Sequence, residues 1–433
     1  MIKTIQAALA EGFTDPIRDV LWGHIYLCPG MSALITSAPF MRLHRIQQLG
    51  PVFRVYPGAT HTRASHSIGV YHLGRRLLQN LVERGAACWL SAEGVRSFLC
   101  ACLLHDLGHF PYTHSLKELP LRSHESLTGA AILSEPLRSL IGKTKADPEL
   151  TAAIVDKELP GGAKSTKSDE NAGQKSASGE LGFYRKLLSG CLDPDKLDYL
   201  NRDARYCGVP YGIQDVDFIF SRLFPHAERG VDIDSRLIPN VEAILFSKYL
   251  MYRTVYWHKQ VRAATAMIKK ALLFALESGQ ITGGELYNLD DQSLFSLLQS
   301  RSSGGHNFLA ESVWEGRVFA LAAEIPFADK FHGALKDICN RSDYEAQVAG
   351  KLRSMGIPAN AEDIIIDMPE PVSFETGLFV QDEGKNFSDS SSAFKAETVN
   401  AFIQSLYTVR IFINPVYEEK AKALPGLQTI LNF

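Results

Sequence analysis

The sequence predicts a mainly α protein, with a large helical bundle over residues 1–280 and a smaller α+β region over residues 281–433. Two observations predict the helical part. Apolar residues recur near a 3.6-residue period between Ser65 and Leu81, which is the spacing of one face of an amphipathic helix. The run over residues 95–107 is apolar almost throughout, which is typical of a helix that is buried on most sides.

Two short apolar runs near the end of the chain predict the smaller region. Asp363–Met368 and Val409–Ile413 contain several β-branched residues and are bounded by Pro, which is typical of buried strands. Residues 374–396 between them are polar and rich in Ser. We expect this segment to form a long loop.

Turn and capping residues predict the remaining secondary-structure elements. Trp22–Leu27 and Val52–Tyr56 combine aromatic and β-branched residues next to Gly or Pro, which favours short extended segments. Between them, residues 39–49 are expected to form a helix that ends at Gly50. Further helices are expected over residues 124–142, 150–157, 181–206 and 238–279.

Two segments lack the apolar side chains that a packed element needs. Residues 161–180 are rich in Gly, Ser, Lys and Ala and contain no aromatic or large aliphatic residue. Such a composition favours an exposed or disordered loop. Residues 300–305 carry a Ser/Gly cluster and are also expected to be an exposed loop.

The composition narrows the class of protein. Lys and Arg together number 45 and Asp and Glu 48, for a formal charge of −3, which argues against a protein that binds nucleic acid by neutralising its backbone. Seven Cys without a C-x-x-C pair argue against a disulfide framework and fit a reducing compartment. The first residues lack a secretory signal and no apolar run is long enough to span a membrane. We therefore expect a cytoplasmic protein with no membrane partner.

Histidines cluster in one part of the chain. Seven of the 13 His lie between His61 and His124, and His66 shares a helix face with apolar residues. The apolar run over residues 95–107 ends in His105 and Asp106. An ionised carboxylate in an apolar setting is costly unless it is paired or binds metal, and imidazole with carboxylate is a natural ligand set for divalent ions. The simpler interpretation is a His–Asp hydrogen bond that closes the end of a helix.

A second polar segment follows about 90 residues later. Asp193 is a good N-cap and Asp195 then lies in the first turn of the helix. Taken alone, Asp195 is an acid that favours the helix dipole. However, Lys196, Tyr199 and Asp203 follow the spacing i, i+3, i+7 and share one face, as a polar binding wall would. Residues 253–259 form a third polar face, with an ordinary solvated face as the alternative.

The ordered motifs resemble a known family. His66, His105–Asp106 and Asp195 match the H…HD…D signature of the HD-domain metal-dependent phosphohydrolases. The flanking strings RLHRIQQLG, ATHTRASHSIGVYHLG, LLHDLGHFPYTH, SHES, LDPDKLDYLNRDARYCGVPYG and VYWHKQVRAATAMIKKAL occur in the order of that family. Together they resemble its deoxynucleoside triphosphate triphosphohydrolase branch, which includes bacterial dGTPases and the vertebrate SAM-and-HD-domain dNTPase. The resemblance covers residues 20–270, with a weaker echo in VRIFINP near the end.

The resemblance implies a role for each matching residue. It implies an HD-domain bundle, a divalent metal cofactor and a homo-oligomer that acts on nucleotides; Mn, Fe, Zn, Ni and Mg are not distinguished. The implied metal ligands are His66, His105, Asp106 and Asp195. The implied catalytic residues are His114, His124 and His109. The implied substrate contacts are Arg63, Lys196 and Tyr199 for the triphosphate, and Gln48, Leu49, Asp203 and Tyr256 for the sugar.

The chain departs from the family pattern at two positions. Lys117 stands where the family carries an acid that orients His114, with Glu118 beside it, and Trp257 replaces a Gln after Tyr256. The first change concerns the proton relay and the second concerns base recognition or allostery. Since one fold serves several reactions, other HD-type nucleotidases or phosphodiesterases stay open. A nucleotide-binding regulatory protein with little turnover is a further alternative, and nucleic-acid binding is a weaker one.

Overall fold

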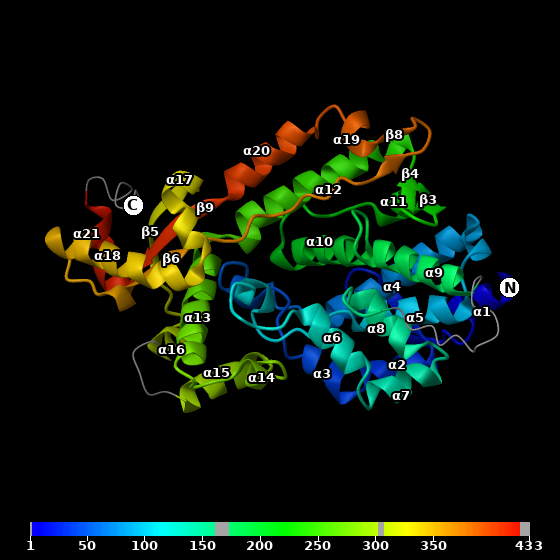
Figure 1. Ribbon diagram of the computed structural model, residues 1–433, viewed down its shortest axis with the longest axis horizontal. Coiled ribbons are helices and arrows are strands. Elements are labelled where there is room, and N and C mark those ends of the chain that lie inside the picture. The colour runs from blue at the N-terminus through cyan, green and yellow to red at the C-terminus, as the bar shows by residue number, and fades with distance from the viewer. Residues whose placement is uncertain (1, 161–172, 302–306, 425–433) are drawn as a thin grey trace.

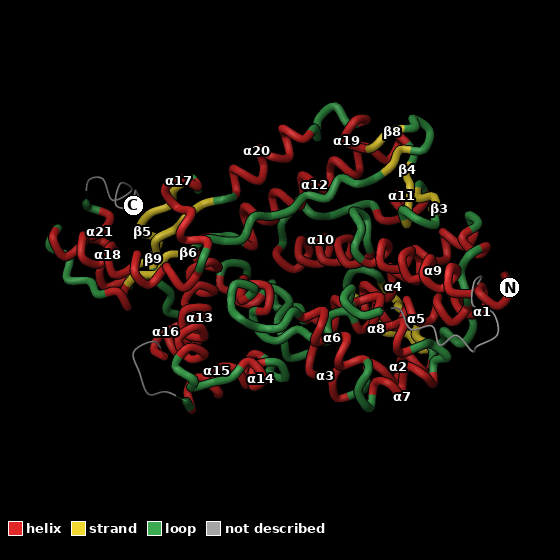
Figure 2. Tube along the Cα trace, in the orientation of Figure 1, coloured by secondary structure: helices red, strands yellow, loops and turns green. Residues whose placement is uncertain are grey.

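The computed structural model describes residues 2–160, 173–301 and 307–424 (Figure 1). The fold is mainly helical, as predicted, and a smaller α+β region follows in the C-terminal part of the chain (Figure 2). Within these ranges, no helix has the length and apolar character that crossing a membrane would require.

Three helices form the centre of the helical bundle. α4 (Arg63–Glu83) packs against both α5 (Ala92–Leu104) and α10 (Pro194–Cys207). The apolar positions that predicted α4, such as Leu73, Leu77 and Leu81, are buried as expected. Around this centre lie α1 (Ile2–Ala10), α2 (Pro29–Ile35), α3 (Ala38–Leu43), α6 (His124–Ile132), α7 (Leu137–Lys143), α8 (Pro148–Val155), α9 (Gly173–Leu188), α11 (Val216–Ser221), α12 (Ile238–Met251) and α13 (Lys259–Glu277).

Helix α13 connects the bundle to the C-terminal region, because it contacts β5, β6 and α16 as well as the turn after α3. A three-stranded antiparallel sheet has the order β5 (Ala320–Pro326), β9 (Thr408–Ile413), β6 (Ile364–Asp367). The two predicted strands are β6 and β9, which are adjacent and buried. The helices of this region are α14 (Gly283–Leu286), α15 (Asp291–Ser300), α16 (Asn307–Trp314), α17 (Asp329–His332), α18 (Arg341–Ser354), α19 (Phe387–Ser390), α20 (Ala396–Leu406) and α21 (Glu418–Lys422).

After β6 the chain returns to the helical bundle. β7 (Phe379–Val380) pairs in parallel with β4 (Gly230–Ile233) and completes a sheet of order β3–β4–β7–β8, with β3 over Leu223–His226 and β8 over Lys385–Asn386. A separate hairpin joins β1 (Asp15–Asp19) to β2 (Gly23–Leu27). Residues 369–375, here called the strap, therefore run from β6 towards this sheet and along the bundle (Figure 1).

Several predicted elements differ from the observed ones near the site. Val52–Tyr56 is not a strand, because Gly50–Arg54 forms a 3₁₀ helix that Pro51 starts and the Val52 carbonyl closes. The helix expected over residues 39–49 ends at Leu43 and gives way to turns before Gly50, whose φ is +52°. Helix α4 begins at Arg63 with Thr62 as its N-cap, rather than at Ser65.

The longer predicted segments are divided more finely than expected. Residues 124–142 form two helices separated at Pro136, and residues 238–279 contain a π-helical turn at Tyr252–Tyr256. Of the loop expected over residues 161–180, residues 161–172 lie outside the described part and residues 173–180 belong to α9. Most of the loop expected over residues 300–305 also lies outside it, and residues 374–396 contain β7, β8 and α19. The domain boundary at residue 280 stays a prediction.

Candidate active site

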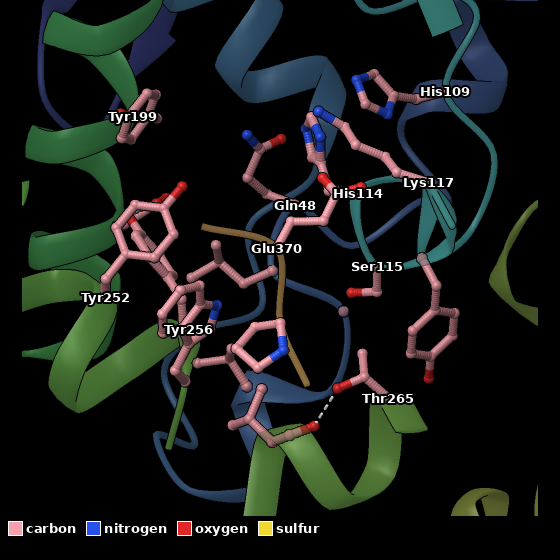
Figure 3. Close-up of a pocket in the computed structure, with 18 of the residues that line it drawn as sticks. Gln48, His109, His114, Ser115, Lys117, Tyr199, Tyr252, Tyr256, Thr265 and Glu370 are labelled. Carbon is pink, nitrogen blue, oxygen red and sulfur yellow. Dashed lines mark hydrogen bonds between the residues drawn. The ribbon is translucent and has the colours of Figure 1, made fainter. Parts of the chain in front are cut away.

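A cavity of about 470 Å³ lies where the helical bundle, α13 and the strap meet. Its walls come from the start of α4, the end of α5, the segment 105–124, α10 and the turn between α12 and α13. Figure 3 shows side chains from these separate segments pointing into one space. The predicted site residues that line it are Gln48, Leu49, Arg63, His66, His105, Asp106, His109, His114, His124, Asp195, Tyr199, Asp203 and Tyr256.

Three of the four predicted metal ligands form a compact group. His66, His105 and Asp195 each offer a donor atom, and these atoms all lie within 4.8 Å of one another. His66 Nε2 is 2.9 Å and His105 Nε2 is 3.8 Å from Asp195 Oδ1. His66 lies in the first turn of α4, His105 caps the C-terminal end of α5, and Asp195 lies in the first turn of α10. Three helix ends therefore converge on one point.

The other ring nitrogens fix which atom of each histidine faces this point. His105 Nδ1 lies 3.0 Å from the Cys102 carbonyl oxygen, which only accepts, so Nδ1 carries a proton. His105 Nε2 is buried and has no hydrogen-bond partner. His66 Nδ1 lies 2.8 Å from Asp198 Oδ2 and donates to that carboxylate. Nε2 is therefore the atom of each ring that faces the same place and that binds a metal ion once it is deprotonated, as in metal-binding histidines whose Nδ1–H is held by an outer acceptor.

A polar shell behind His66 holds its partner Asp198. Arg202 donates to Asp198 through Nε at 2.8 Å and Nη2 at 2.9 Å, and the indole of Trp22 donates at 2.6 Å. Burial opposes ionisation, but Arg202 and His66 lower the pKa of Asp198 to about 2. Gly69 permits this approach, because a Cβ there would lie 1.9 Å from Asp198 Oδ1. Asp198 is therefore an ionised acceptor that orients His66.

The fourth predicted ligand, Asp106, lies beside the group. Its Oδ1 is 3.2 Å from His105 Nε2 and 3.1 Å from His109 Nε2, and its Oδ2 accepts from Arg63 Nη1 at 2.7 Å. Burial opposes ionisation, yet His109, His105 and Arg63 hold the pKa of Asp106 well below its ordinary value. Asp106 is thus an ionised carboxylate next to His105, and its role as a ligand stays a prediction.

Opposite charges stabilise one another in the ligand group. Although burial alone would lower it, the carboxylates of Asp195 and Asp198 raise the pKa of His66 to about 10. Burial opposes the ionisation of Asp195, but His105 and His66 hold its pKa well below the ordinary value. These carboxylates favour a positive centre between the two imidazoles. The donor set fits a divalent ion, which would replace the proton on His66 Nε2.

Three further histidines lie together along the adjacent wall. The ring centroids of His109 and His124 are 4.0 Å apart, those of His109 and His114 4.7 Å, and those of His114 and His124 5.2 Å. Burial by the cavity walls, and then the positive charge of Arg63, lowers the pKa of His109 and His114. Neutral imidazoles in this position are suited to exchange protons with a bound substrate.

The four residues that were predicted to contact the sugar also line the cavity. Asp203 accepts from the Tyr256 hydroxyl at 2.6 Å and its other oxygen lies 2.8 Å from His61 Nε2. Gln48 and Leu49 line the same cavity from the segment before Gly50. The carboxylate, the phenol and the amide come from three separate segments, which sequence periodicity alone does not bring together.

Lys196 is placed differently from the prediction. It does not line the cavity, and its ammonium instead pairs with Asp193 Oδ2 at 2.8 Å and with Glu375 Oε2 at 3.3 Å. Asp193 is the N-cap of α10, so the turn of the helix brings its second oxygen to Lys196. The role of Lys196 as a triphosphate contact stays a prediction.

Two family models match successive parts of the chain, one in the helical bundle and one that extends into the C-terminal region. The HD domain model matches residues 63–157, and the HD associated region model matches residues 223–423. The chain therefore contains an HD domain followed by an HD associated region. The matched HD domain contains His66, His105 and Asp106, and the associated region contains Tyr256, α13 and the strap.

Curated relatives of this HD-domain protein include named and uncharacterised proteins. YwfO of Bacillus subtilis, described as uncharacterised, is 34% identical over 241 residues, which are 55% of this chain and 50% of that protein. The human deoxynucleoside triphosphate triphosphohydrolase SAMHD1 is 28% identical over 313 residues, 65% of this chain and 49% of that protein. The chain thus spans about half the length of the curated relatives it matches.

Solved structures share the fold over most of the chain. A hypothetical protein from Aquifex aeolicus superposes with a TM-score of 0.70 at 27% identity and covers 94% of this chain and 99% of its own. A phosphohydrolase from Bacteroides thetaiotaomicron superposes with a TM-score of 0.68 at 22% identity, over 92% of this chain and 99% of its own. The fold shared with these structures therefore includes the C-terminal region as well as the HD domain.

Sequence reasoning missed the residues that enter the site from distant segments. Lys248 lines the cavity and donates to the Ser373 carbonyl at 2.7 Å, and Glu370 enters from the strap. Glu118 lies beside the histidine wall but is bound by Lys269 and Arg341, so it does not replace the missing acid next to His114. For Asp198, the spacing to Asp195 and Arg202 along α10 was a usable signal. No local sequence pattern predicted that Glu370 would line the site.

Proposed function

We propose that this HD-domain protein hydrolyses deoxynucleoside triphosphates to a deoxynucleoside and inorganic triphosphate, with a divalent metal ion as cofactor. One observation carries the proposal: the His66–His105–Asp195 group shares a single cavity with Gln48 and the Asp203–Tyr256 pair. A metal site that shares a cavity with a carboxylate, a phenol and an amide suits a nucleotide whose phosphates face the metal and whose sugar hydroxyl bonds to these groups. The likeness to deoxynucleoside triphosphate triphosphohydrolase SAMHD1 supports the same substrate class.

The chemistry follows from the groups on the cavity walls. When bound, a divalent ion would lower the pKa of a water molecule and draw electron density from a phosphoryl oxygen. Asp198 and the Cys102 carbonyl hold the two imidazoles in place for it. Arg63, fixed by Asp106, would face the phosphate oxygens with a planar guanidinium. The protein thus contributes orientation and charge neutralisation.

Proton transfer falls to the histidine wall in this scheme. Water attacks the α-phosphorus, the bond from phosphorus to the 5′-oxygen breaks, and that oxygen needs a proton to leave. His114 borders the cavity and would donate it as a general acid. A bound triphosphate would offset the positive charge that lowers the pKa of His114, so His114 would hold a proton more readily when substrate is present.

The test uses purified protein with Mn²⁺ and each of the four dNTPs in H₂¹⁸O. We expect inorganic triphosphate as the product, with ¹⁸O in the triphosphate and none in the deoxynucleoside, and His105→Ala should release neither. Release of only monophosphate or pyrophosphate from every dNTP would overturn the proposal. Ribonucleotides, cyclic nucleotides and guanosine polyphosphates in the same assay test the other HD-type phosphohydrolase activities. Nucleotide binding without any turnover would favour a regulatory protein.

A further inference from the structure

Five cationic side chains line the cavity, and four of them are already engaged. Arg63 pairs with Asp106, Arg262 with Asp367 and Lys269 with Glu118, while Lys248 donates to the Ser373 carbonyl. Each of these contacts holds two segments of the wall together. These four cations are therefore partly neutralised before any substrate enters.

Lys117 is the exception among these five. It is exposed and lines the cavity, and within the described ranges it forms no hydrogen bond or ion pair. Figure 3 shows its side chain pointing into the cavity, as does that of His114. Its positive charge acts on the histidine wall, where it contributes to the lowered pKa of His114 and His124. A free ammonium in a partly enclosed cavity is a binding group for an anion.

The neighbouring residue fixes the backbone that carries Lys117. Glu118 accepts from Lys269 of α13 and from both Nη atoms of Arg341 of α18. Arg341 is buried and its Nε also donates to the Leu335 carbonyl at 2.9 Å. Glu118 lines the cavity as well, and its contacts with the C-terminal region hold the turn that carries the adjacent Lys117. The C-terminal region thus shapes the wall that presents this ammonium.

The strap adds a carboxylate to the cavity, and Lys196 is not among the residues that line it. Glu370 of the strap also lines the cavity but forms no ion pair with Lys117 among the described residues. Lys196 pairs with Asp193 and Glu375 outside the lining. A polyphosphate in the cavity would therefore meet a free ammonium at the His114 turn rather than on α10.

We propose that Lys117 binds the polyphosphate chain of the substrate directly, as the free cationic group of the cavity. The inference rests on the proposed function for the identity of the nucleotide, but binding of an inorganic polyphosphate tests it separately. Lys117 then supplies a substrate contact at the position where the sequence resemblance implies an acid beside the histidine. The carboxylate of Glu370, which lines the same cavity, would repel this anion.

The experiment measures the affinity of the Mn²⁺-loaded protein for inorganic triphosphate by calorimetry, at a fixed excess of Mn²⁺. We expect Lys117→Ala to raise Kd by about 10- to 100-fold, the usual range for a lost charge-assisted hydrogen bond. Lys117→Arg should stay within about threefold of wild type, and Glu370→Gln should tighten binding. Lys143→Ala is the matched control, because Lys143 is exposed on α7 and does not line the cavity.

Steady-state kinetics separates this inference from the proposed function. We expect Lys117→Ala to raise KM for a dNTP in step with Kd for triphosphate. An unchanged Kd and KM in a folded Lys117→Ala variant would overturn the role of Lys117 and leave the enzymatic proposal intact. If the wild type binds triphosphate through Lys117 but hydrolyses no dNTP, the enzymatic proposal fails and the role of Lys117 stands.

Discussion

Two buried clusters of charge lie close together and differ in one respect. The ligand cluster (His66, His105, Asp106 and Asp195) and the junction cluster (Glu118, Arg262, Lys269, Arg341 and Asp367) both place carboxylates among cationic groups. In the junction cluster the carboxylates meet guanidinium and ammonium groups that are always charged. In the ligand cluster Asp106 also meets the Arg63 guanidinium. Asp195, however, pairs with the imidazoles of His66 and His105, and His105 Nε2 makes no hydrogen bond among the described residues.

The difference separates a structural cluster from a binding one. Arg262 meets Asp367 through two hydrogen bonds, at 2.8 and 2.5 Å, and joins α13 to β6. Such a pair is complete by itself, and removing one partner leaves an uncompensated buried charge. The ligand cluster is complete only when a proton or a cation lies between its imidazoles and Asp195. It follows that variants in the two clusters should affect different properties.

The largest effect is expected from the ligand cluster. His105→Ala and Asp106→Ala should each abolish metal binding and lower kcat by more than about 1000-fold, since even the outer partners of metal ligands matter by 10- to 100-fold. His105→Ala should stay folded, because His105 Nε2 has no hydrogen bond to lose. Asp106→Ala should stay folded as well but with a lower free energy of unfolding, because it leaves the buried Arg63 guanidinium without its carboxylate. Circular dichroism and elemental analysis check these outcomes. Retained metal stoichiometry in either variant would contradict the assignment, and Asp367→Asn, as the matched control, should keep the metal.

The next effect concerns the residue behind His66. Asp198→Asn should weaken metal binding by about 10- to 100-fold, because the amide no longer fixes the charge and tautomer of His66. Asp19→Asn is the control, since Asp19 contacts Arg202 at 2.9 Å in the same shell but does not touch His66. Metal titration of both variants compares them. Equal losses in the two would mean that the shell acts only through stability.

The junction cluster should make the free energy of unfolding depend on pH in the acid range. Burial opposes ionisation of Asp367, but Arg262 and Lys269 lower its pKa from 3.8 to about 2. A depressed folded-state pKa gives stability that is present above pH 3.8 and is lost as the pH falls towards 2, about 2 kcal/mol in full. The free energy of unfolding of wild type should therefore fall towards that of Asp367→Asn over this window. A difference that does not depend on pH would contradict the cited shift.

The smallest effect is expected in the sugar pocket. Tyr256→Ala removes the hydroxyl that donates to Asp203, and KM should rise by roughly 10-fold. Metal content should be unchanged, because Tyr256 is not part of the ligand cluster. Tyr256→Phe should show the same direction with a smaller change. If Tyr256→Ala unfolds the protein instead, this residue serves the core rather than the substrate.

The sequence predicted best what depends on local periodicity and on motif order. The apolar spacing of α4 and the His105–Asp106 end of α5 located two sides of the site, and Asp193 marked the start of α10. The strands β6 and β9 were likewise predicted by short apolar runs. These signals act within one or two helical turns, and the burial of the elements confirms them.

Other features depend on contacts between distant segments and could not be read locally. Val52–Tyr56 has strand-forming residues, but Gly50 and Pro51 start a tight 3₁₀ turn there. Lys196 shares a helix face with Tyr199 and Asp203 by spacing, yet Asp193 and Glu375 draw its ammonium out of the cavity. The sequence alone left Glu118 open as the acid that orients His114, because its partner Arg341 lies 223 residues further along the chain.

The most direct measurement is the position of a bound metal ion. Crystals grown with Mn²⁺ should give one strong anomalous peak per chain within coordination distance of His66 Nε2, His105 Nε2 and an Asp195 oxygen. The same crystals of His105→Ala should lack it. No peak at this point in the wild type, or a peak held by other residues, would contradict the account of a metal-dependent hydrolase.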